Sequence, residues 1–341
     1  MPDSELEKQL YHLLRAQLGD YFGPDQLCQV AGTFFSSVQQ ALVRLEQRGA
    51  PIECHPALGY RLAQIPDVLL PCELSYGLET RCFGQWVRVH QEVGSTNDEA
   101  RQLVEQQAPE GALVLAESQR QGRGRRGRTW HSPPHVGLWC SLLVYPHEQI
   151  PPGFFTMLFG VALARTLRLH YSAAVTLKWP NDILLDDRKV AGILCEFHAS
   201  PNSRPALIAG FGINVNQKNF PPALRSSATS IFLHTGHKIS RSTLLKKLLQ
   251  EVEQAYICAA SGGEDLLLDQ ARRFSSTLGR QVLVKTDDQE IRGLACDLDA
   301  SGALILEDHT GARRTIHAGD VHHSTDLDSG EIPLDSQATG S

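Results

Sequence analysis

The sequence has no long apolar run, no closely spaced pair of cysteines and no N-terminal signal pattern. Its longest weakly polar stretch, from Ile150 to Ala164, is too short to cross a bilayer and predicts a buried helix. The eight cysteines form no CxxC pair, so we expect reduced thiols rather than a disulfide framework or a zinc site. The N-terminus, MPDSELEKQL, is acidic and polar, so we expect a cytoplasmic protein that does not contact membranes.

An excess of basic charge is also missing, because the formal net charge is −6. A whole surface of this charge does not predict nucleic-acid binding. The charge is unevenly spread, however: there is no carboxylate between Glu117 and Glu148, whereas five arginines lie between Arg120 and Arg128. This local concentration of arginine needs an explanation of its own.

The arginines are spaced by glycines in the segment Gly122-Arg-Gly-Arg-Arg-Gly127, which matches the dinucleotide fingerprint G-x-G-x-x-G. Pro133-Pro134 follows too soon for the helix that this fingerprint requires, and no GxxxxGK[ST] phosphate loop occurs. Arginine binds phosphate oxygens in a two-pronged way, and the glycines would let the loop close and open. A loop for nucleotide chemistry is therefore one interpretation, and a solvated or RNA-binding loop is the other.

Apolar patterning divides the 341 residues into several units. Residues 1–65 predict three helices and a hairpin, the layout of a winged helix-turn-helix domain. Residues 66–80 contain two prolines and predict a linker. Residues 81–277 alternate strand and helix patterns and predict a catalytic α+β domain on a mostly antiparallel sheet. Residues 278–323 predict a small SH3-like β-barrel, and residues 324–341 predict a disordered tail.

Three further segments carry a family resemblance. They are Gly94-Ser-Thr-Asn97, Lys178-Trp-Pro-Asn-Asp182 followed by Asp187-Arg-Lys-Val-Ala-Gly-Ile-Leu194, and Gly210-Phe-Gly-Ile-Asn-Val-Asn216. Together with the arginine loop, their order and spacing resemble the bifunctional biotin–protein ligase and biotin operon repressor family across about residues 85–275. The predicted winged helix and β-barrel match that family in layout as well.

The resemblance implies a ligase that uses ATP and Mg²⁺ to convert biotin to biotinyl-5′-AMP. The biotin would then pass to a lysine of a biotin carboxyl carrier protein, a subunit of acetyl-CoA carboxylase. The implied catalytic residues are Lys189, Arg123, Arg125, Arg126 and Arg128. The implied biotin-binding residues are Ser95, Thr96, Asn97, Gln119, Arg123, Gly124, Arg125, Lys189, Gly192, Gly210, Gly212 and Ile213. The implied ATP-binding residues are Arg123, Arg125, Arg126, Arg128, Trp130, Lys178, Asn181, Asp182 and Asn214, with Asp182 also a candidate ligand of the Mg²⁺ that ATP carries.

Each of these residues also has a purely structural interpretation. Ser95 or Thr96 could only cap a helix, since Thr96-x-x-Glu99 fits a capping box. Gln119 could be a polar strand end, Lys189 a surface lysine, and the glycines turn or bulge positions. The segment Pro180-Asn-Asp182 could be a structural turn.

The resemblance also implies a repressor that binds the operator of biotin-synthesis genes as an adenylate-loaded homodimer. Phe35, Ser36, Gln39, Gln40 and Arg61 are the candidate DNA-binding residues. The expected recognition helix carries no charge between Gly32 and Val43, and residues 1–65 hold five Lys or Arg against seven Asp or Glu. Because phosphate contacts dominate DNA affinity, an acidic domain is at a disadvantage, and a role in dimerisation or partner contact stays open.

Two other classes of function compete with the ligase. Lipoate or octanoate transfer shares a similar catalytic architecture, but the arginine loop and the two Lys-containing segments argue against it. A regulator that only senses a small ligand is disfavoured by the weak recognition helix.

Overall fold

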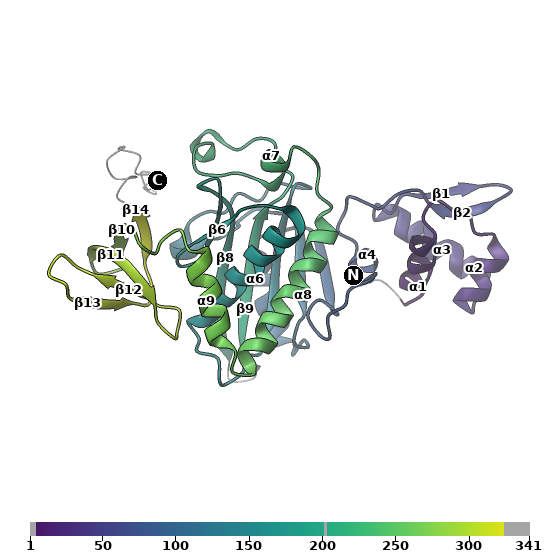
Figure 1. The fold of residues 1–341 in the computed structure, drawn as a ribbon. Helices are drawn as coiled ribbons and strands as arrows, with labels where there is room; N and C mark the ends of the chain where they lie inside the picture. The colour runs from purple at the N-terminus through teal and green to yellow at the C-terminus, as the bar shows by residue number, and fades with distance from the viewer. Residues whose placement is uncertain (1–4, 201–202, 324–341) are drawn as a thin grey trace, which may run out of the picture.

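The computed structural model describes residues 5–200 and 203–323, which form three parts in a row (Figure 1). A helical N-terminal part lies at one end, a sheet covered by helices lies in the middle, and a small β-sheet lies at the other end. Residues 324–341, the predicted disordered tail, lie outside the described ranges. Within those ranges, no helix has both the length and the apolar character that a membrane span needs.

The N-terminal part consists of three helices and a hairpin. Its elements are α1 (Glu5–Ala16), α2 (Pro24–Ala31), α3 (Phe35–Gln47), β1 (Ile52–His55) and β2 (Gly59–Leu62). Leucines on all three helices are fully buried and form the core. Phe22 pairs with Tyr60 and ties the hairpin to the helices. Gly59 permits this approach, because a side chain there would collide with the carbonyl of Phe22.

The predicted linker, residues 66–80, is packed against both of its neighbours. It contains the short helix α4 (Pro71–Ser75). Leu70 and Cys72 belong to the core of the N-terminal part, whereas Leu69 and Leu74 belong to the core of the central part. The sequence did not predict this helix, because apolar side chains shared between two cores follow neither a helical nor a strand period.

The central part is built on a seven-stranded sheet with the order β3-β4-β5-β9-β8-β7-β6. Only β3 and β4 are parallel, so the prediction of an α+β fold on a mostly antiparallel sheet is confirmed. The strands are β3 (Val87–Val93), β4 (Leu113–Gln119), β5 (Gly137–Val144), β6 (Thr176–Lys178), β7 (Asp182–Leu185), β8 (Arg188–Ser200) and β9 (Ser203–Asn214).

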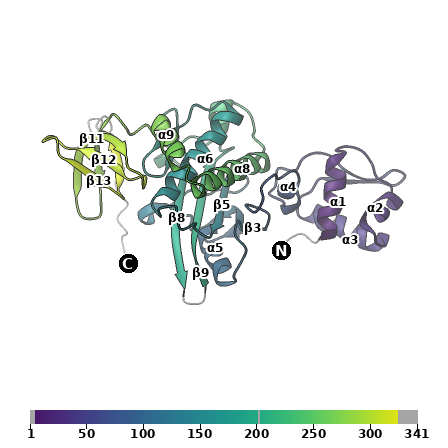
Figure 2. The ribbon, with the colours of Figure 1, turned by 60° about the horizontal axis from the view of Figure 1, so that its bottom comes forward.

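Helices cover both faces of this sheet (Figures 1 and 2). The helices α6 (Phe154–Tyr171), α8 (Arg241–Ala260) and α9 (Glu264–Phe274) lie on one face, α5 (Thr96–Glu105) lies on the other, and α7 (Ile231–Thr235) precedes α8. Because successive side chains of a strand point to opposite faces of the sheet, β4 contributes to the cores on both faces. Leu113 and Leu115 pack in the core that includes α6 and α8, whereas Val114 packs with α5. Helix α6 is buried on nearly all sides, as its apolar sequence predicts.

The C-terminal part is a five-stranded antiparallel sheet with the order β13-β12-β11-β10-β14. Its strands are β10 (Gln281–Lys285), β11 (Glu290–Leu298), β12 (Leu304–Glu307), β13 (Arg313–Ile316) and β14 (Asp320–His323). The indole of Trp179 donates a hydrogen bond to the carbonyl of Gly302, which joins this sheet to the central part. The start of β14 reaches the cleft described next.

Candidate active site

A cleft of about 470 Å³ opens between the arginine loop, the strands β8 and β9, and the start of β14. This volume lies in the range of small-molecule binding sites. Every residue predicted above for biotin, ATP or catalysis lines the cleft, with the exceptions of Arg126 and Ile213. Segments spread over more than 100 residues of sequence therefore meet at one place.

The two exceptions have clear physical reasons. Ile213 is fully buried in the main core, because its neighbours Gly212 and Asn214 take the face of β9 that lines the cleft. Arg126 has a left-handed backbone (φ 55°) and its guanidinium pairs with Asp287 at 2.5 Å. The structure therefore places Arg126 and Ile213 outside the lining of the cleft, and biotin binding by Ile213 and ATP binding and catalysis by Arg126 stay predictions.

The start of α5 forms a polar pocket at one end of the cleft. Ser95, Thr96 and Asn97 are each at least 95% buried. Helix α5 begins without a side-chain cap from Ser95, so the capping interpretation of this segment is wrong. Instead, Gln119 Oε1 accepts a hydrogen bond from the backbone N–H of Thr96 at 2.8 Å, and Gln119 Nε2 donates to Ser132 Oγ at 2.8 Å.

Three glycines make room for side chains rather than for turns. A Cβ atom at Gly212 would lie 2.4 Å from the Trp130 indole, and one at Gly192 would lie 3.1 Å from the same ring. A Cβ atom at Gly210 would lie 2.4 Å from the side-chain oxygen of Asn97. Since none of the three has a positive φ, close packing, not backbone strain, requires glycine here.

The arginine loop is anchored at its beginning by Asp98, in the first turn of α5. The Arg123 guanidinium donates to both carboxylate oxygens of Asp98, at 2.7 and 2.5 Å. These hydrogen bonds from Arg123 hold the pKa of Asp98 below its usual range, and the same carboxylate raises the pKa of Arg123. The anchor lies directly after the polar pocket formed by Ser95, Thr96 and Asn97.

The end of the loop is anchored by Asp320 at the start of β14. Arg128 donates to Asp320 at 2.7 Å, and Arg125 lies 3.8 Å from the same carboxylate while it donates to the carbonyl of Gly319. Burial lowers the pKa of Arg125, and Asp320 opposes this shift. No nucleotide-binding helix follows the glycines: residues Arg125–Gly127 form only a single turn, η1, as the prolines predict.

Lys189 lies on the floor of the cleft between an anion and an aromatic ring. Its Nζ lies 2.7 Å from Asp182 Oδ1 and 5.1 Å from the centroid of the Trp130 ring. The side chain is 31% exposed, which contradicts the interpretation of Lys189 as a freely solvated surface lysine. A flexible, partly exposed ammonium group in this position can exchange Asp182 for an incoming anion.

The predicted asparagines hold backbone segments around the cleft. Asn181 Nδ2 donates to the carbonyl of Ile193 at 2.9 Å, and Asn214 Nδ2 donates to the carbonyl of Thr229 at 3.0 Å. The segment of residues 220–228, which includes the short turn η2 (Pro222–Leu224), forms one wall of the cleft. The backbone of Ser227 accepts a hydrogen bond from the amide of Lys189, which attaches this wall to β8.

Sequence reasoning missed several residues of the site. Asp98, Ser132, Ser141 and Asp320 make the contacts that hold the predicted residues in place. A signal existed for Ser141, because it is the one hydroxyl in the apolar strand sequence GLWCSLLV of β5. No local signal marks Asp320, which lies 192 residues after its partner Arg128.

Comparison with known protein families agrees with this architecture. The profile of the Biotin/lipoate A/B protein ligase family matches residues 90–214, and that of the Biotin protein ligase C terminal domain matches residues 277–324. The first match covers β4, β5, β8 and the arginine loop, and the second covers the five-stranded sheet. The fold and its cleft thus define a protein ligase of the biotin/lipoate class.

Similar proteins narrow this class. The chain is 31% identical over 323 residues to the Bifunctional ligase/repressor BirA of Bacillus subtilis, across 93% of this chain and 98% of that protein. It is 28% identical over 309 residues to the protein of the same name from Escherichia coli, across 90% and 94%. The structure of a biotin protein ligase from Aquifex aeolicus in complex with biotin and ATP has a TM-score of 0.62 at 26% identity, across 70% of this chain and 98% of that one. The chain belongs to the biotin–protein ligase family.

Proposed function

We propose that the chain activates biotin with MgATP to biotinyl-5′-AMP and transfers the biotin to a lysine of a biotin carboxyl carrier protein. One observation carries the proposal: a single cleft joins a buried polar pocket, the ammonium group of Lys189 and the guanidinium groups of the arginine loop. The polar pocket suits a neutral urea, whereas the cationic part suits a carboxylate and phosphates. A relative of known structure was solved with biotin and ATP, which supports this pair of substrates.

The reaction needs no protein nucleophile. The biotin carboxylate attacks the α-phosphorus of ATP, a bond forms between them, and the α–β phosphoanhydride bond breaks to release pyrophosphate. Lys189 binds the carboxylate and the α-phosphate, and Arg125 and Arg128 exchange Asp320 for phosphate oxygens. An acceptor lysine amine then attacks the acyl carbon, loses a proton, and AMP leaves.

Magnesium arrives with the ATP phosphates. Asp182 offers one carboxylate at the cleft, but this carboxylate is paired with Lys189. Among the residues that the structure describes, no group of three His, Cys, Asp or Glu side chains could hold a metal ion. The side chains therefore fit an ion that keeps its phosphate and water ligands, as magnesium prefers.

The arginine loop acts as a lid over the adenylate in this proposal. Its two carboxylate anchors, Asp98 and Asp320, belong to different parts of the chain. A loop held at both ends excludes water from the mixed anhydride, which hydrolyses readily. Glycines within the loop permit the opening that lets the acceptor lysine enter.

We also propose that residues 1–65 are a winged helix-turn-helix domain, residues 81–277 the catalytic domain and residues 278–323 an SH3-like barrel. The repressor names of the relatives support operator binding by an adenylate-loaded homodimer. Phe35, Ser36, Gln39 and Gln40 at the start of α3 are at least partly exposed, as a DNA-reading face requires. Arg61 is ion-paired with Glu53 at 2.7 Å, which weakens its candidacy as a phosphate contact.

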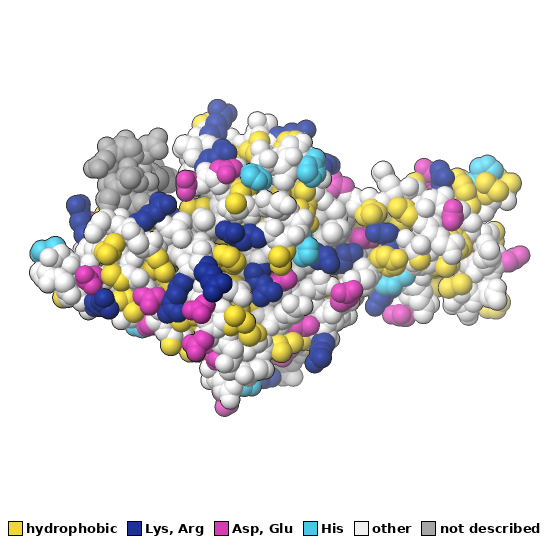
Figure 3. Space-filling view, in the orientation of Figure 1, with side chains coloured by type: hydrophobic (Ala, Val, Ile, Leu, Met, Phe, Trp, Pro, Cys, Tyr) yellow, Lys and Arg dark blue, Asp and Glu magenta, His cyan; other side chains and the backbone are white. Residues whose placement is uncertain are grey.

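The acidic charge balance of residues 1–65 favours weak rather than tight DNA binding. On the face shown in Figure 3 the N-terminal part carries hydrophobic side chains among scattered charges. Phe34, directly before α3, is 84% exposed. A gel-shift experiment with a biotin-operon DNA, biotin and ATP tests operator binding. A shift that requires both small molecules supports the repressor, and its absence at low salt refutes it.

The ligase proposal is tested by incubating the protein with biotin, MgATP and a biotin carrier domain and probing the carrier for biotin. We expect labelling of the carrier lysine that requires both biotin and ATP. Addition of excess lipoate should not reduce the labelling, because lipoate lacks a urea. Lipoylation of the carrier in place of biotinylation would instead favour the lipoate-transfer class.

A further inference from the structure

The arginine loop is a hairpin, and its tip reaches the C-terminal sheet. The amide of Gly124 donates to the carbonyl of Arg128 at 2.7 Å, and the amide of Arg128 donates to the carbonyl of Arg125 at 3.2 Å. Between them, Arg126 and Gly127 both have a positive φ, 55° and 71°, as in a tight two-residue hairpin turn. Because these bonds make the hairpin one piece, the contacts at its tip decide whether it opens.

Arg126 stands at a position where glycine or asparagine would be less strained. A left-handed backbone is uncommon for a long side chain, and residues held in it cluster at functional sites. The guanidinium at this position makes three contacts with the C-terminal sheet. Its Nη2 donates to Asp287 Oδ1 at 2.5 Å, and its Nη1 donates to the carbonyl of Lys285 at 3.1 Å and lies 3.5 Å from Asp320 Oδ2. These contacts offset the strain at the tip.

The C-terminal sheet presents the three partners together. Lys285 at the end of β10 pairs in register with Asp320 at the start of β14, so that one guanidinium can reach both. Asp287 lies in the turn after β10, which is closed by a hydrogen bond from the amide of Thr286 to the carbonyl of Gln289 at 2.9 Å. The sheet and its turn therefore fix the partners of Arg126 in place.

The contacts of Arg126 differ in one respect from those of the other arginines at the tip. Arg125 and Arg128 line the cleft, and in the mechanism proposed above they exchange Asp320 for phosphate oxygens. Arg126 and Asp287 do not line the cleft, so a nucleotide inside it does not compete for their contact. The pair can therefore persist after the adenylate has formed, when Asp320 has lost its other partners.

We propose that Arg126 and Asp287 are positioning residues that hold the tip of the arginine loop on the C-terminal sheet and so slow the escape of the adenylate. The inference deepens the proposed function and rests on it for the identity of the enclosed ligand. The pair is solvent-accessible, with Arg126 31% and Asp287 88% exposed, so its loss should favour the open loop by no more than about fivefold. Arg126 thus acts on the lifetime of the intermediate rather than on its formation.

Release of a stable analogue tests the inference without requiring catalysis. The probe is a labelled sulfamoyl analogue of biotinyl-5′-AMP, which does not react with amines, bound to the full chain and chased with unlabelled analogue. Asp287→Ala should accelerate its release by up to about fivefold. The matched control is Asp288→Ala, because in the part of the chain that the structure describes Asp288 forms no ion pair with the loop arginines. This control should release the analogue like the wild type.

A double-mutant cycle separates the tip contact from a general loss of structure. Arg126→Gln should accelerate release at least as much as Asp287→Ala, and the double variant should release the analogue no faster than Arg126→Gln alone. With biotin and MgATP but no acceptor, Asp287→Ala should also free biotinyl-5′-AMP into solution, while the rate at which it forms the adenylate changes less than about twofold. Melting temperatures show whether the variants fold.

The outcomes separate the two proposals. Wild-type protein that neither binds the analogue nor forms adenylate would refute the proposed function, and the tip contact would then have no adenylate to retain. Wild-type protein that retains the analogue, with folded Asp287→Ala releasing it at the same rate, would overturn the further inference alone. So would Arg126→Gln protein that raises KM for ATP without faster release, because Arg126 would then bind phosphate. Additive acceleration in the double variant would overturn it as well, since the two residues would act independently.

Discussion

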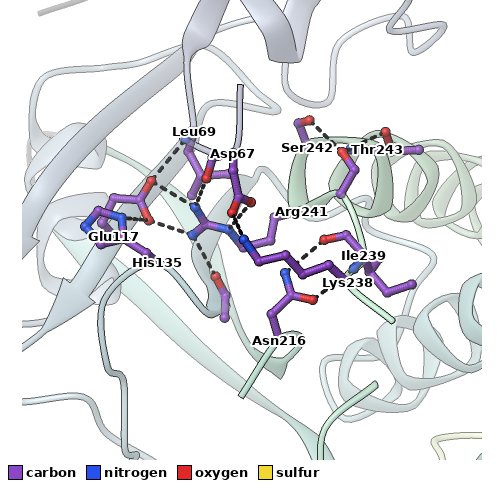
Figure 4. Close-up of polar contacts among 12 residues, drawn as sticks. Asp67, Leu69, Glu117, His135, Asn216, Lys238, Ile239, Arg241, Ser242 and Thr243 are labelled. Atoms are coloured by element: carbon purple, nitrogen blue, oxygen red, sulfur yellow. Dashed lines mark hydrogen bonds and ion pairs between the residues drawn. The ribbon is translucent and has the colours of Figure 1, made fainter. Parts of the chain in front are cut away.

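Glu117 and Arg241 form an ion pair at 2.6 Å in which each side chain is only 1% exposed (Figure 4). Arg241 also donates to the carbonyl of Asp67 at 2.6 Å, and Glu117 accepts the amide of Leu69 at 3.0 Å. The pair thereby fastens the segment before α4 to the strand β4, which ends at Gln119 in the cleft. A buried pair thus connects the ligand pocket to the junction with the N-terminal part.

Replacement of one partner should therefore destabilise the protein strongly. Glu117→Leu leaves the buried Arg241 charge with only the Asp67 carboxylate, 4.0 Å away and 47% exposed, and should cost about 3–5 kcal/mol in the free energy of unfolding. The double variant with Arg241→Met should recover much of this loss. Urea denaturation measures both, and the control Arg313→Met, which breaks an exposed pair with Glu307, should cost less than about 1 kcal/mol. A single Glu117→Leu variant as stable as this control would contradict the account.

A second buried carboxylate holds the N-terminal part itself. Glu73 on α4 is fully buried and accepts from Tyr11 at 3.0 Å and Arg15 at 2.9 Å, both on α1, and from Lys246 on α8 at 3.1 Å. Burial and the neighbouring Glu73 raise the pKa of Tyr11, which keeps its hydroxyl a donor. We predict that Glu73→Gln loosens the junction and accelerates proteolysis within residues 66–80 several-fold, while biotin-dependent exchange persists. Unchanged proteolysis would show that the apolar contacts alone hold the junction.

The arginine loop should no longer retain the adenylate when the contacts of its arginines are removed. Arg125→Gly removes the contact with Gly319 and Asp320 and adds backbone freedom, so we expect biotinyl-5′-AMP to escape and to label lysines of unrelated proteins. Mass spectrometry of the reaction mixture detects both the released adenylate and the labelled lysines. Arg120→Gly is the control, because Arg120 is 69% exposed and pairs only loosely with Glu92 at 3.5 Å. If the two variants retain the adenylate equally, the lid is not held by Arg125.

The Asp98–Arg123 anchor predicts the pH dependence of the loop. The pKa of Asp98 is depressed, chiefly by its hydrogen bond with Arg123. Its stabilising contribution is therefore complete above the ordinary carboxyl pKa and is lost as the pH falls through the depressed value. We predict that the relative protection of the loop amides against hydrogen exchange, after correction for the intrinsic rate, is constant between about pH 5 and about pH 8. Asp98→Asn should lower this protection several-fold at every pH, and a wild-type loop that loosens within this window would contradict the anchor.

Much of the site could be predicted from the sequence because its residues occur in compact motifs. The motifs alone identify Ser95, Thr96 and Gln119 with the pocket and Lys189 with its cationic floor. Asp98 and Asp320 were missed because a carboxylate that binds an arginine across two parts of a chain leaves no local pattern. The side chain of Ile213 lies in the core and not in the cleft, because the pleat of β9 sends alternate side chains to opposite faces, and a sequence motif does not show which of its residues share a face.

The fold was predictable to a similar degree. Helical and strand periods gave the three helices and hairpin, the mostly antiparallel sheet and the C-terminal strands. The packed junction was not predictable, because Leu69, Leu70, Cys72 and Leu74 divide between two cores and only the assembled structure shows which core each one joins. The buried Glu73 could not be recognised either, since its three partners lie on α1 and α8.

The central claim is that Lys189 and the arginine loop activate the carboxyl group of biotin on ATP. Biotin-dependent exchange of labelled pyrophosphate into ATP measures this step directly, and mass spectrometry can detect the biotinyl-5′-AMP that accompanies it. We predict exchange and adenylate for the wild type and for the control Lys218→Ala, whose ammonium group lies over Phe232 rather than in the cleft, and a nearly complete loss for Lys189→Ala. Wild-type protein that forms no adenylate, or Lys189→Ala protein that exchanges like the wild type, would contradict the account.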